Sequence, residues 1–260
     1  MSGQPYDFVP YKYGAFSFTS YADRRKLIER GLLADDENQW QLTDEGRRVI
    51  GGTPDMELAA FVQQYGSLRG DALVAETYRR FPYFAIRSEI AERVLSGDHE
   101  ALRRVEAARP KANGYAVHTI GYEGLTLESY LNALLRAGVT VLCDVRRNPI
   151  SRKYGFSKGT LSRACSRVGI RYEHLPELGI ASEQRRSLDT QEDYDALFAD
   201  YEREWLPNQT GSLGIIRKWI NEGDCVALTC YEHLPQQCHR HCVAAAMEAQ
   251  FGTDFRARHL

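Results

Sequence analysis

Hydrophobic and polar positions follow two alternating periods in the second half of the chain. A β-branched, apolar run over residues 115–120 predicts a strand, and Leu127, Tyr130 and Leu134 then follow helical spacing up to Gly138. The alternation continues, with strands predicted over 139–145, 170–174, 225–230 and 253–259 and helices over 157–168, 193–205, 213–221 and 239–251. Strands that alternate with helices favour a Rossmann-like α/β fold with a mostly parallel sheet and flanking helices.

The first half is predicted to be mainly helical, with one small β feature. A helix that begins near Thr19 or Ser20 and ends before Gly31 leads into a polar hairpin, and Thr43 has the position of a helix cap. This order resembles the latter part of a winged helix. The segment 109–114 contains Pro, Asn and Gly, which predicts a boundary between two domains. We therefore expect a winged-helix-like domain over residues 1–113 and an α/β domain over residues 114–260.

Composition narrows the class of protein. The 260 residues carry a net charge of −2, 43% are hydrophobic and six are Cys. These proportions exclude a disordered chain and a disulfide-dense mini-protein. The longest apolar runs are far shorter than the roughly 20 residues that span a bilayer, and no signal peptide is visible. We expect a cytoplasmic protein with reduced thiols and no membrane partner.

Polar and ionisable side chains gather where the predicted strands end. Ligands of open α/β sheets bind in the crevice outside the carboxyl ends of the strands. The candidate substrate- or phosphate-binding residues are Tyr122, Glu123, Arg146, Arg147, Ser151, Lys153, Tyr154, His174, Glu177, Cys230, Cys238 and Arg240.

Four segments of this half resemble the motifs of a known family: HTIGYEG, CDVRRNPISRKYGFSK, RYEHLPELG and ALTCYEHLPQQCHRHCVA. They are similar, over residues 116–260, to the prokaryotic family called domain of unknown function 488. The resemblance implies a Rossmann-like fold, and labels given to some members imply a DNA-repair-like or defence-related role. The family's motif positions fall here on Asp144, Arg146, Pro149, Ser151, Phe156, Ser157, His174, Glu177, Cys230, Glu232, Cys238, His239 and Arg240.

The near-neutral total charge conceals a basic segment. Residues 146–171 contain eight Lys or Arg and no acid, with Tyr154 and Phe156 between them. Such a segment favours a phosphate or nucleic-acid partner, and the candidate contacts are Arg152 and Lys158 here and Arg24 and Arg25 in the first half. The alternative is a solvated helix face, which accounts better for Arg163 and Arg167 than for Arg152.

Asp144 and Glu232 are the leading catalytic candidates. Both follow strands that could be neighbours, so their carboxylates could face one substrate, with His239 to orient it or to carry protons. A carboxylate pair beside bound phosphate suits cleavage of an N-glycosidic bond in a nucleotide. The alternative is that Asp144 forms a structural ion pair with Arg146 or Arg240.

The thiols suggest two other chemistries, neither of which is favoured. Cys238 lies three residues after Pro235, where a helix is predicted to start, and a helix N-terminus lowers the pKa of a thiol. Cys230 ends a strand, but no Gly-rich anion loop follows it, so thiol catalysis is the weaker hypothesis. Cys238 and Cys242 with His239 and His241 could bind zinc, and Cys230 could be a third thiolate, but no CxxC pair is present. We therefore expect no metal or other cofactor.

Two functions from different classes follow. The first is a hydrolase that acts on a nucleotide or nucleic acid through a carboxylate pair in a basic crevice. The second is a non-catalytic nucleic-acid-binding or regulatory module whose crevice senses a ligand. The sequence contains no P-loop, no GxGxxG after a strand and no GxSxG, which disfavours ATP hydrolysis, dinucleotide redox chemistry and serine hydrolysis.

Overall fold

The fold is described from a computed structural model, which places residues 6–36, 39–51, 56–111, 114–181, 184 and 188–260. Contacts between residues divide the chain into two compact units, Met1–Arg109 and Pro110–Leu260. Ala112 and Asn113 of the predicted domain boundary lie outside the described residues. No helix in the described part of the chain has the length and hydropathy that a bilayer-spanning segment needs.

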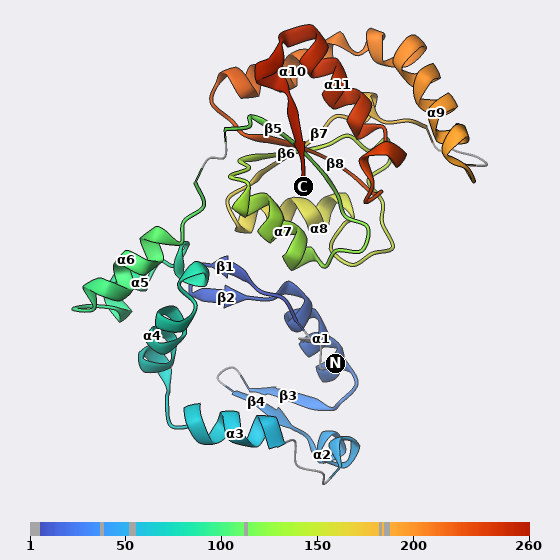
Figure 1. Cartoon of the computed structure of the whole chain (residues 1–260). Helices are drawn as coiled ribbons and strands as arrows, with labels where there is room; N and C mark the ends of the chain where they lie inside the picture. Colours follow the sequence, from blue (N-terminus) through green and yellow to red (C-terminus); the bar gives the residue numbers. More distant parts are fainter. Residues whose placement is uncertain (1–5, 37–38, 52–55, 112–113, 182–183, 185–187) are drawn as a thin grey trace. The chain divides into compact units, whose positions relative to one another are not determined.

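The N-terminal unit is mainly helical and contains two short hairpins (Figure 1). The predicted helix, hairpin and second helix are present as α1 (Phe18–Glu29), β3 (Leu33–Asp36) with β4 (Gln39–Leu42), and α2 (Asp44–Ile50). As expected, the Thr43 side chain caps α2 by accepting a hydrogen bond from the backbone N–H of Gly46. The other hairpin, β1 (Val9–Tyr11) with β2 (Gly14–Phe16), was not predicted, because strands of three residues show no readable alternation.

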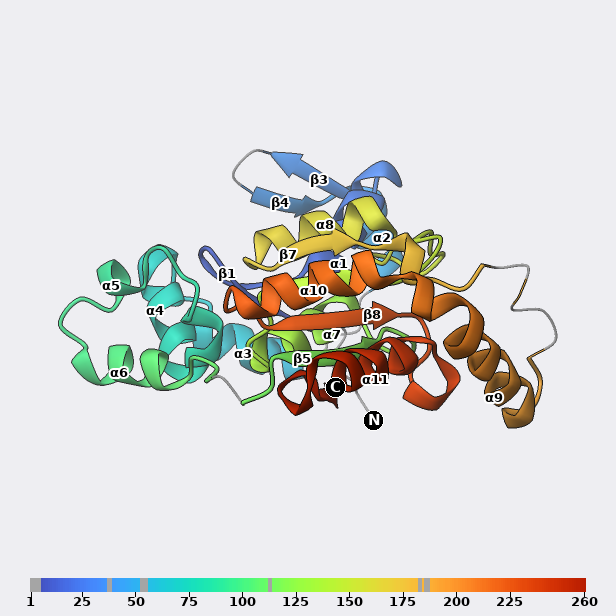
Figure 2. The ribbon, with the colours of Figure 1, turned by 90° about the horizontal axis from the view of Figure 1, so that it is seen from above.

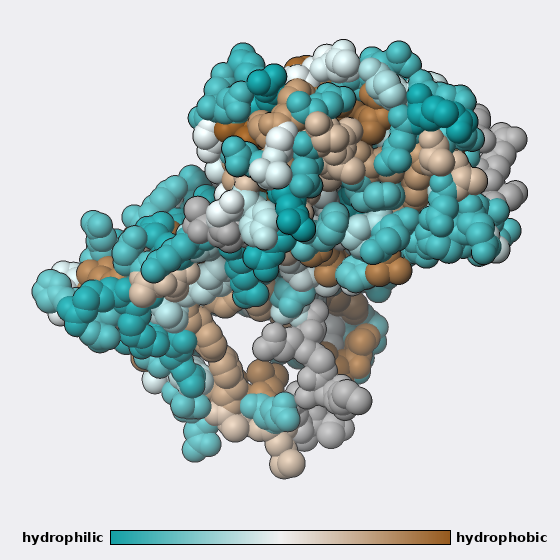
Figure 3. Space-filling view, turned by 45° about the horizontal axis from the view of Figure 1, so that its top comes forward, coloured by the Kyte–Doolittle hydropathy of each residue, from teal (hydrophilic) through white to brown (hydrophobic). Residues whose placement is uncertain are grey.

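The rest of this unit consists of short helices around a small core. They are α3 (Met56–Tyr65), α4 (Gly70–Arg80), the 3-10 turn η1 (Pro82–Ala85), α5 (Ala91–Val94) and α6 (His99–Ala107). Tyr78, Leu95 and Val105 are buried in that core. By contrast, none of the residues of α3 is buried, and apolar side chains reach the surface of this unit (Figure 3).

The C-terminal unit is a parallel five-stranded sheet with helices on both faces, as the alternating pattern predicts. The strands are β5 (Val117–Gly121), β6 (Val141–Asp144), β7 (Arg171–His174), β8 (Val226–Cys230) and β9 (Ala257–His259), and their order in the sheet is β7-β6-β8-β5-β9. The helices are α7 (Leu127–Arg136), α8 (Lys158–Arg167), α9 (Gln191–Asp200), α10 (Thr210–Asn221) and α11 (Arg240–Phe251).

This strand order brings distant segments of the chain together. β8 lies between the consecutive strands β5 and β6, so a strand from much later in the sequence ends beside both of them. Helices α7 and α8 cover one face, and α10 and α11 cover the other, as Figures 1 and 2 show. The three central strands are buried along their whole length, which is typical of parallel sheets covered on both faces.

Two segments depart from the predicted elements. The expected final strand over 253–259 is strand only at β9, because Thr253–Phe255 form a 3-10 turn that leads the chain to the edge of β5. The expected helix over 193–205 changes at Tyr201 from the α9 geometry to a π-helical turn, Tyr201–Trp205. The Tyr201 hydroxyl donates to the backbone oxygen of Leu178, which ties this turn to the loop beyond β7.

Candidate functional site

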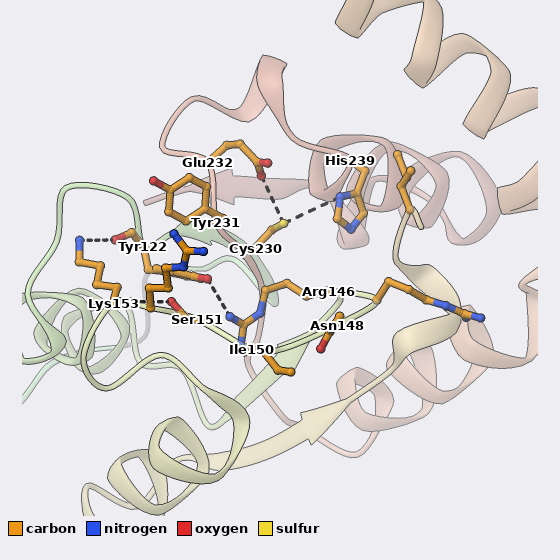
Figure 4. A pocket seen from close by; sticks show the side chains of 13 residues that line it. Tyr122, Arg146, Asn148, Ile150, Ser151, Lys153, Cys230, Tyr231, Glu232 and His239 are labelled. Atoms are coloured by element: carbon orange, nitrogen blue, oxygen red, sulfur yellow. Dashed lines mark hydrogen bonds between the residues drawn. The ribbon is translucent and has the colours of Figure 1, made fainter. Parts of the chain in front are cut away.

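A pocket opens at the carboxyl ends of β5, β6 and β8, where the sequence predicts a crevice (Figure 4). Gly121 at the end of β5 pairs with Cys230 at the end of β8, and Asp144 at the end of β6 pairs with Thr229. The pocket has a volume of about 460 Å³, which lies within the range of small-molecule binding sites. Its walls are formed by Tyr122, Arg146, Arg147, Asn148, Ile150, Ser151, Arg152, Lys153, Ile180, Cys230, Tyr231, Glu232 and His239.

Arg146 forms the floor of the pocket together with a carboxylate behind it. Its Nε and Nη2 donate to separate oxygens of Asp144 at 2.8 and 2.5 Å, and its Nη1 donates to the Tyr122 hydroxyl at 2.8 Å. Burial alone would lower the pKa of Arg146, but the Asp144 carboxylate outweighs it and holds that pKa above its usual value. Arg146 is therefore a fixed cation.

Asp144 is not among the residues that line the pocket. Its side chain is fully buried, and one carboxylate oxygen also accepts a hydrogen bond from the backbone N–H of Arg146 while the other accepts from the Tyr172 hydroxyl at 2.6 Å. Burial, and then the Asp144 charge, raises the pKa of Tyr172. The geometry thus matches the ion-pair alternative considered for Asp144, whose carboxylate faces Arg146 and not the pocket.

Glu232 is the only carboxylate among the described residues that line the pocket. Its position depends on a close approach of two backbones, because a Cβ on Gly121 would lie 1.8 Å from the Glu232 carbonyl oxygen. On the other side, the buried Arg240 guanidinium donates to the backbone oxygens of Glu232 at 2.5 Å and His233 at 2.8 Å. Arg240, a predicted phosphate contact, therefore holds the loop after β8 and is not among the residues that line the pocket.

A cluster of two thiols and an imidazole lies beside Glu232. Cys230, Cys238 and His239 are all buried, and their Sγ and ring nitrogen atoms lie within 4.8 Å of one another. The Cys230 thiol donates to Glu232 Oε2 at 3.3 Å. Burial, and then the neighbouring Cys230, raises the pKa of Cys238 well above its ordinary value. We call these three residues the thiol–imidazole cluster.

Three cations surround the mouth of the pocket. Arg147, Arg152 and Lys153, called the basic rim below, form no ion pair with any carboxylate of the described residues. Lys153 donates to the backbone oxygen of Tyr122 at 3.0 Å, and its own backbone N–H donates to the Ser151 hydroxyl. The rim is therefore an array of positive charge whose geometry is partly fixed.

Several predicted site residues lie outside the pocket walls. His174 donates from Nε2 to the Arg146 backbone oxygen at 2.9 Å, and its Nδ1 accepts from the Lys158 ammonium at 3.1 Å. The Glu123 carboxylate accepts from the backbone N–H of His233. Glu177 and Tyr154 are exposed. His174 and Glu123 support the loops of the site from behind.

Arg24 and Arg25, the predicted nucleic-acid contacts of the N-terminal unit, differ in their surroundings. Arg24 forms an ion pair with Asp35 and lies 4.6 Å from the centre of the Trp40 ring. Arg25 is exposed. Arg24 therefore connects α1 to the β3–β4 hairpin.

The thiols also group differently from the predicted Cys238–Cys242 pair. Cys242 lies with Glu202 and His241, whereas Cys238 lies with Cys230 and His239. Cys238 and His239 precede α11, whereas His241 and Cys242 lie in its first turn, so the thiols fall into two clusters.

Four wall residues were not among the predicted site residues: Asn148, Ile150, Ile180 and Tyr231. Tyr231 is 44% exposed, and an exposed aromatic directly after a buried strand was the available signal for it. Ile180 reaches the pocket because the backbone at Gly179 passes close to the backbone of Arg147. A Cβ on residue 179 would lie 2.1 Å from the backbone nitrogen of Arg147, so only glycine fits there. No local pattern in the sequence reports that contact.

Comparison with known proteins adds one relationship. Searches among curated proteins and among solved structures found no match. A family model described as "Domain of unknown function DUF488" matches residues 126–247, a range that includes Asp144, Arg146, Cys230, Glu232 and His239. The match lies within the C-terminal unit and agrees with the resemblance of its four motifs. Over residues 126–247, the C-terminal unit is therefore similar to the family of domain of unknown function 488.

Proposed function

We propose that the C-terminal unit binds a phosphate-bearing nucleotide, free or within a nucleic-acid strand. It hydrolyses the N-glycosidic bond of that nucleotide, with Glu232 as the group that transfers the proton. The observation that supports this most is that the basic rim and Glu232 line one pocket of about 460 Å³. The rim supplies cations for a phosphate, and a carboxylate beside them supplies acid–base chemistry.

Tyr231 favours a nucleotide over a simple phosphate ester. Its ring is partly exposed on the pocket wall next to Glu232 (Figure 4). Base–aromatic stacking contributes about 1–3 kcal/mol per base. A base stacked on Tyr231, with its phosphate on the basic rim, would bring the sugar and its N-glycosidic bond near Glu232.

The sequence predicts Asp144 as a catalytic partner of Glu232, but in this proposal Asp144 does not act on the substrate. Both of its oxygens are engaged by Arg146 and Tyr172, so it acts as a positioning residue that fixes the Arg146 guanidinium. Glu232 then carries proton transfer alone, to or from water or the leaving base.

The test compares Glu232→Gln with the wild-type chain. Nucleoside monophosphates and a mixed-sequence single-stranded oligonucleotide are incubated with each protein, and free base is measured by chromatography. We expect Glu232→Gln to bind the oligonucleotide as the wild type does but to release base at least about 100-fold more slowly. The exposed Glu192 of α9 does not line the pocket and offers a matched control, and Glu192→Gln should leave the rate unchanged.

The second candidate function is binding without turnover, which the full engagement of Asp144 favours. In that case wild type and Glu232→Gln bind equally and neither releases base. Failure of the wild-type chain to bind any of these nucleotides would overturn both functions.

A further inference from the structure

The thiol–imidazole cluster has a donor set that the proposed hydrolysis does not require. Two thiols and one imidazole nitrogen converge within 4.8 Å of one another, and all three residues are at least 99% buried. Soft thiolate and imidazole ligands together select zinc and related transition metals. Most buried cysteines pack among apolar side chains, whereas Cys230 and Cys238 face each other and a histidine.

The histidine is oriented as a metal ligand should be. His239 Nε2 lies 3.0 Å from the backbone oxygen of Val145, which can only accept, so Nε2 carries the proton. In the neutral ring the other nitrogen, Nδ1, then presents its lone pair, and it lies 3.9 Å from Cys230 Sγ. A ligating histidine usually donates its second ring N–H to a carbonyl or carboxylate in this way.

The backbone around the cluster is fixed before any metal binds. Cys230 is the last residue of β8, and His239 immediately precedes α11. The loop between them is closed by Arg240, which donates to the carbonyl oxygens of Glu232 and His233. Preorganised ligands of this kind favour binding, because little chain entropy is lost when the ion enters.

We propose that Cys230, Cys238 and His239 form a Cys₂His site for a zinc ion, with the fourth coordination position directed into the pocket. Cys230 and His239 are pocket-wall residues, so the open position would face the ligand. Two thiolates and a neutral imidazole balance the charge of a divalent ion, and a buried centre without net charge avoids a large desolvation cost. Three protein ligands and one open position are the pattern of catalytic zinc sites, whereas structural sites use four protein ligands.

Glu232 is placed to work with such an ion. Its Oε2 lies 3.3 Å from Cys230 Sγ but is not one of the three convergent donors. A carboxylate beside the open position can accept a proton from a water bound there, because a zinc ion lowers the pKa of its water to about 7. The metal site stands on its own geometry and does not depend on which ligand the pocket binds.

The experiment uses the full chain and Co(II) or Zn(II) alone, without nucleotide and in the presence of a phosphine reductant. One equivalent of Co(II) should produce the visible bands of a tetrahedral site and a thiolate-to-cobalt charge-transfer band. X-ray absorption of the zinc-loaded wild-type protein should show two sulfur neighbours at about 2.3 Å and one nitrogen neighbour at about 2.0 Å. A shell of oxygen and nitrogen alone, or no uptake by the wild type, would overturn the proposal without any variant.

Variants then assign the ligands. Cys230→Ser, Cys238→Ser and His239→Gln should each weaken Co(II) binding by more than about 100-fold. Cys242→Ser is the matched control, since Cys242 is also a buried thiol and follows His239 by three residues, but belongs to the cluster with Glu202 and His241. Loss of the cobalt bands in Cys242→Ser, with their retention in Cys230→Ser, would place the ion in that other cluster and contradict the proposal. Arg152→Ala with Lys153→Ala should leave metal binding intact, which separates this site from nucleotide binding.

Discussion

Asp144 and Arg146, two residues apart at the end of β6, form a bidentate ion pair that is almost closed to solvent. The Arg146 side chain is 6% exposed and that of Asp144 is 0% exposed. Removal of one member of a buried pair leaves the other charge without compensation, which is strongly destabilising. The pair thus connects the stability of the sheet to the geometry of the pocket floor.

Asp144→Asn should therefore lower the free energy of unfolding of the C-terminal unit by about 3–5 kcal/mol. Urea denaturation followed by tryptophan fluorescence is suitable, because Trp205 and Trp219 lie in this unit. Tyr172→Phe removes only one neutral donor from the same carboxylate and should cost about 1 kcal/mol. Equal stability of Asp144→Asn and wild type would show that the ion pair is not structural.

Gly121, at the end of β5, lies directly against the backbone of Glu232. A Cβ at position 121 would meet backbone at 1.8 Å, so Gly121→Ala must displace the loop that carries Glu232 and the thiol–imidazole cluster. We expect a loss of ligand binding and a fall in melting temperature. Gly214→Ala is the control, since Gly214 lies in α10 with nothing within 4 Å, and the change should stabilise that helix by up to about 1 kcal/mol. If Gly121→Ala binds the ligand as the wild type does, the position of this loop does not affect ligand binding.

These two examples show why the sequence predicted the edge of the sheet but not the roles of its residues. Alternating apolar periods predict the strands, and strand ends in a parallel sheet meet at one edge, so Arg146, Cys230 and Glu232 were correctly placed together. Whether Asp144 faces the ligand or its own neighbour depends on the path of the chain after β6. That path is set by contacts such as Tyr172 with Asp144, 28 residues apart, which no local pattern encodes.

The same distinction holds for the cysteines. Helical spacing relates Cys238 to Cys242, because residues four apart share a helix face. The α11 helix begins at Arg240, however, so Cys238 lies in the loop before it and meets the end of β8 instead. A boundary shift of one or two residues thus changes which thiols lie together.

The C-terminal unit should lose stability when the pH falls below about 6.5. His118 in β5 is buried, and burial, followed by the charge of Arg258, lowers its pKa in the folded state. In this range the unfolded chain binds more protons than the folded one, so the free energy of unfolding decreases as pH falls. His118→Asn should reduce the slope of the free energy of unfolding against pH by up to about 1.4 kcal/mol per pH unit. Urea midpoints measured between pH 5 and pH 8 test this, and identical slopes for both proteins would contradict it.

The salt dependence of binding distinguishes a phosphate-binding pocket from a generally basic surface. The acid-free segment 146–171 places Arg152 and Lys153 on the basic rim, whereas Arg163 and Arg167 are exposed on α8 and do not line the pocket. Binding of a single-stranded oligonucleotide should weaken with salt, and log K should fall by about 0.7 per log unit of salt for each phosphate contact.

Arg152→Ala with Lys153→Ala should therefore weaken oligonucleotide binding and reduce the salt slope by about 1.4, since two contacts are lost. Arg163→Ala with Arg167→Ala removes the same charge from the same segment and should leave the slope unchanged. Fluorescence anisotropy across a series of salt concentrations measures both. Equal losses in the two double variants would mean that the oligonucleotide follows the basic face of the segment as a whole, and the pocket would then have no special part in phosphate binding.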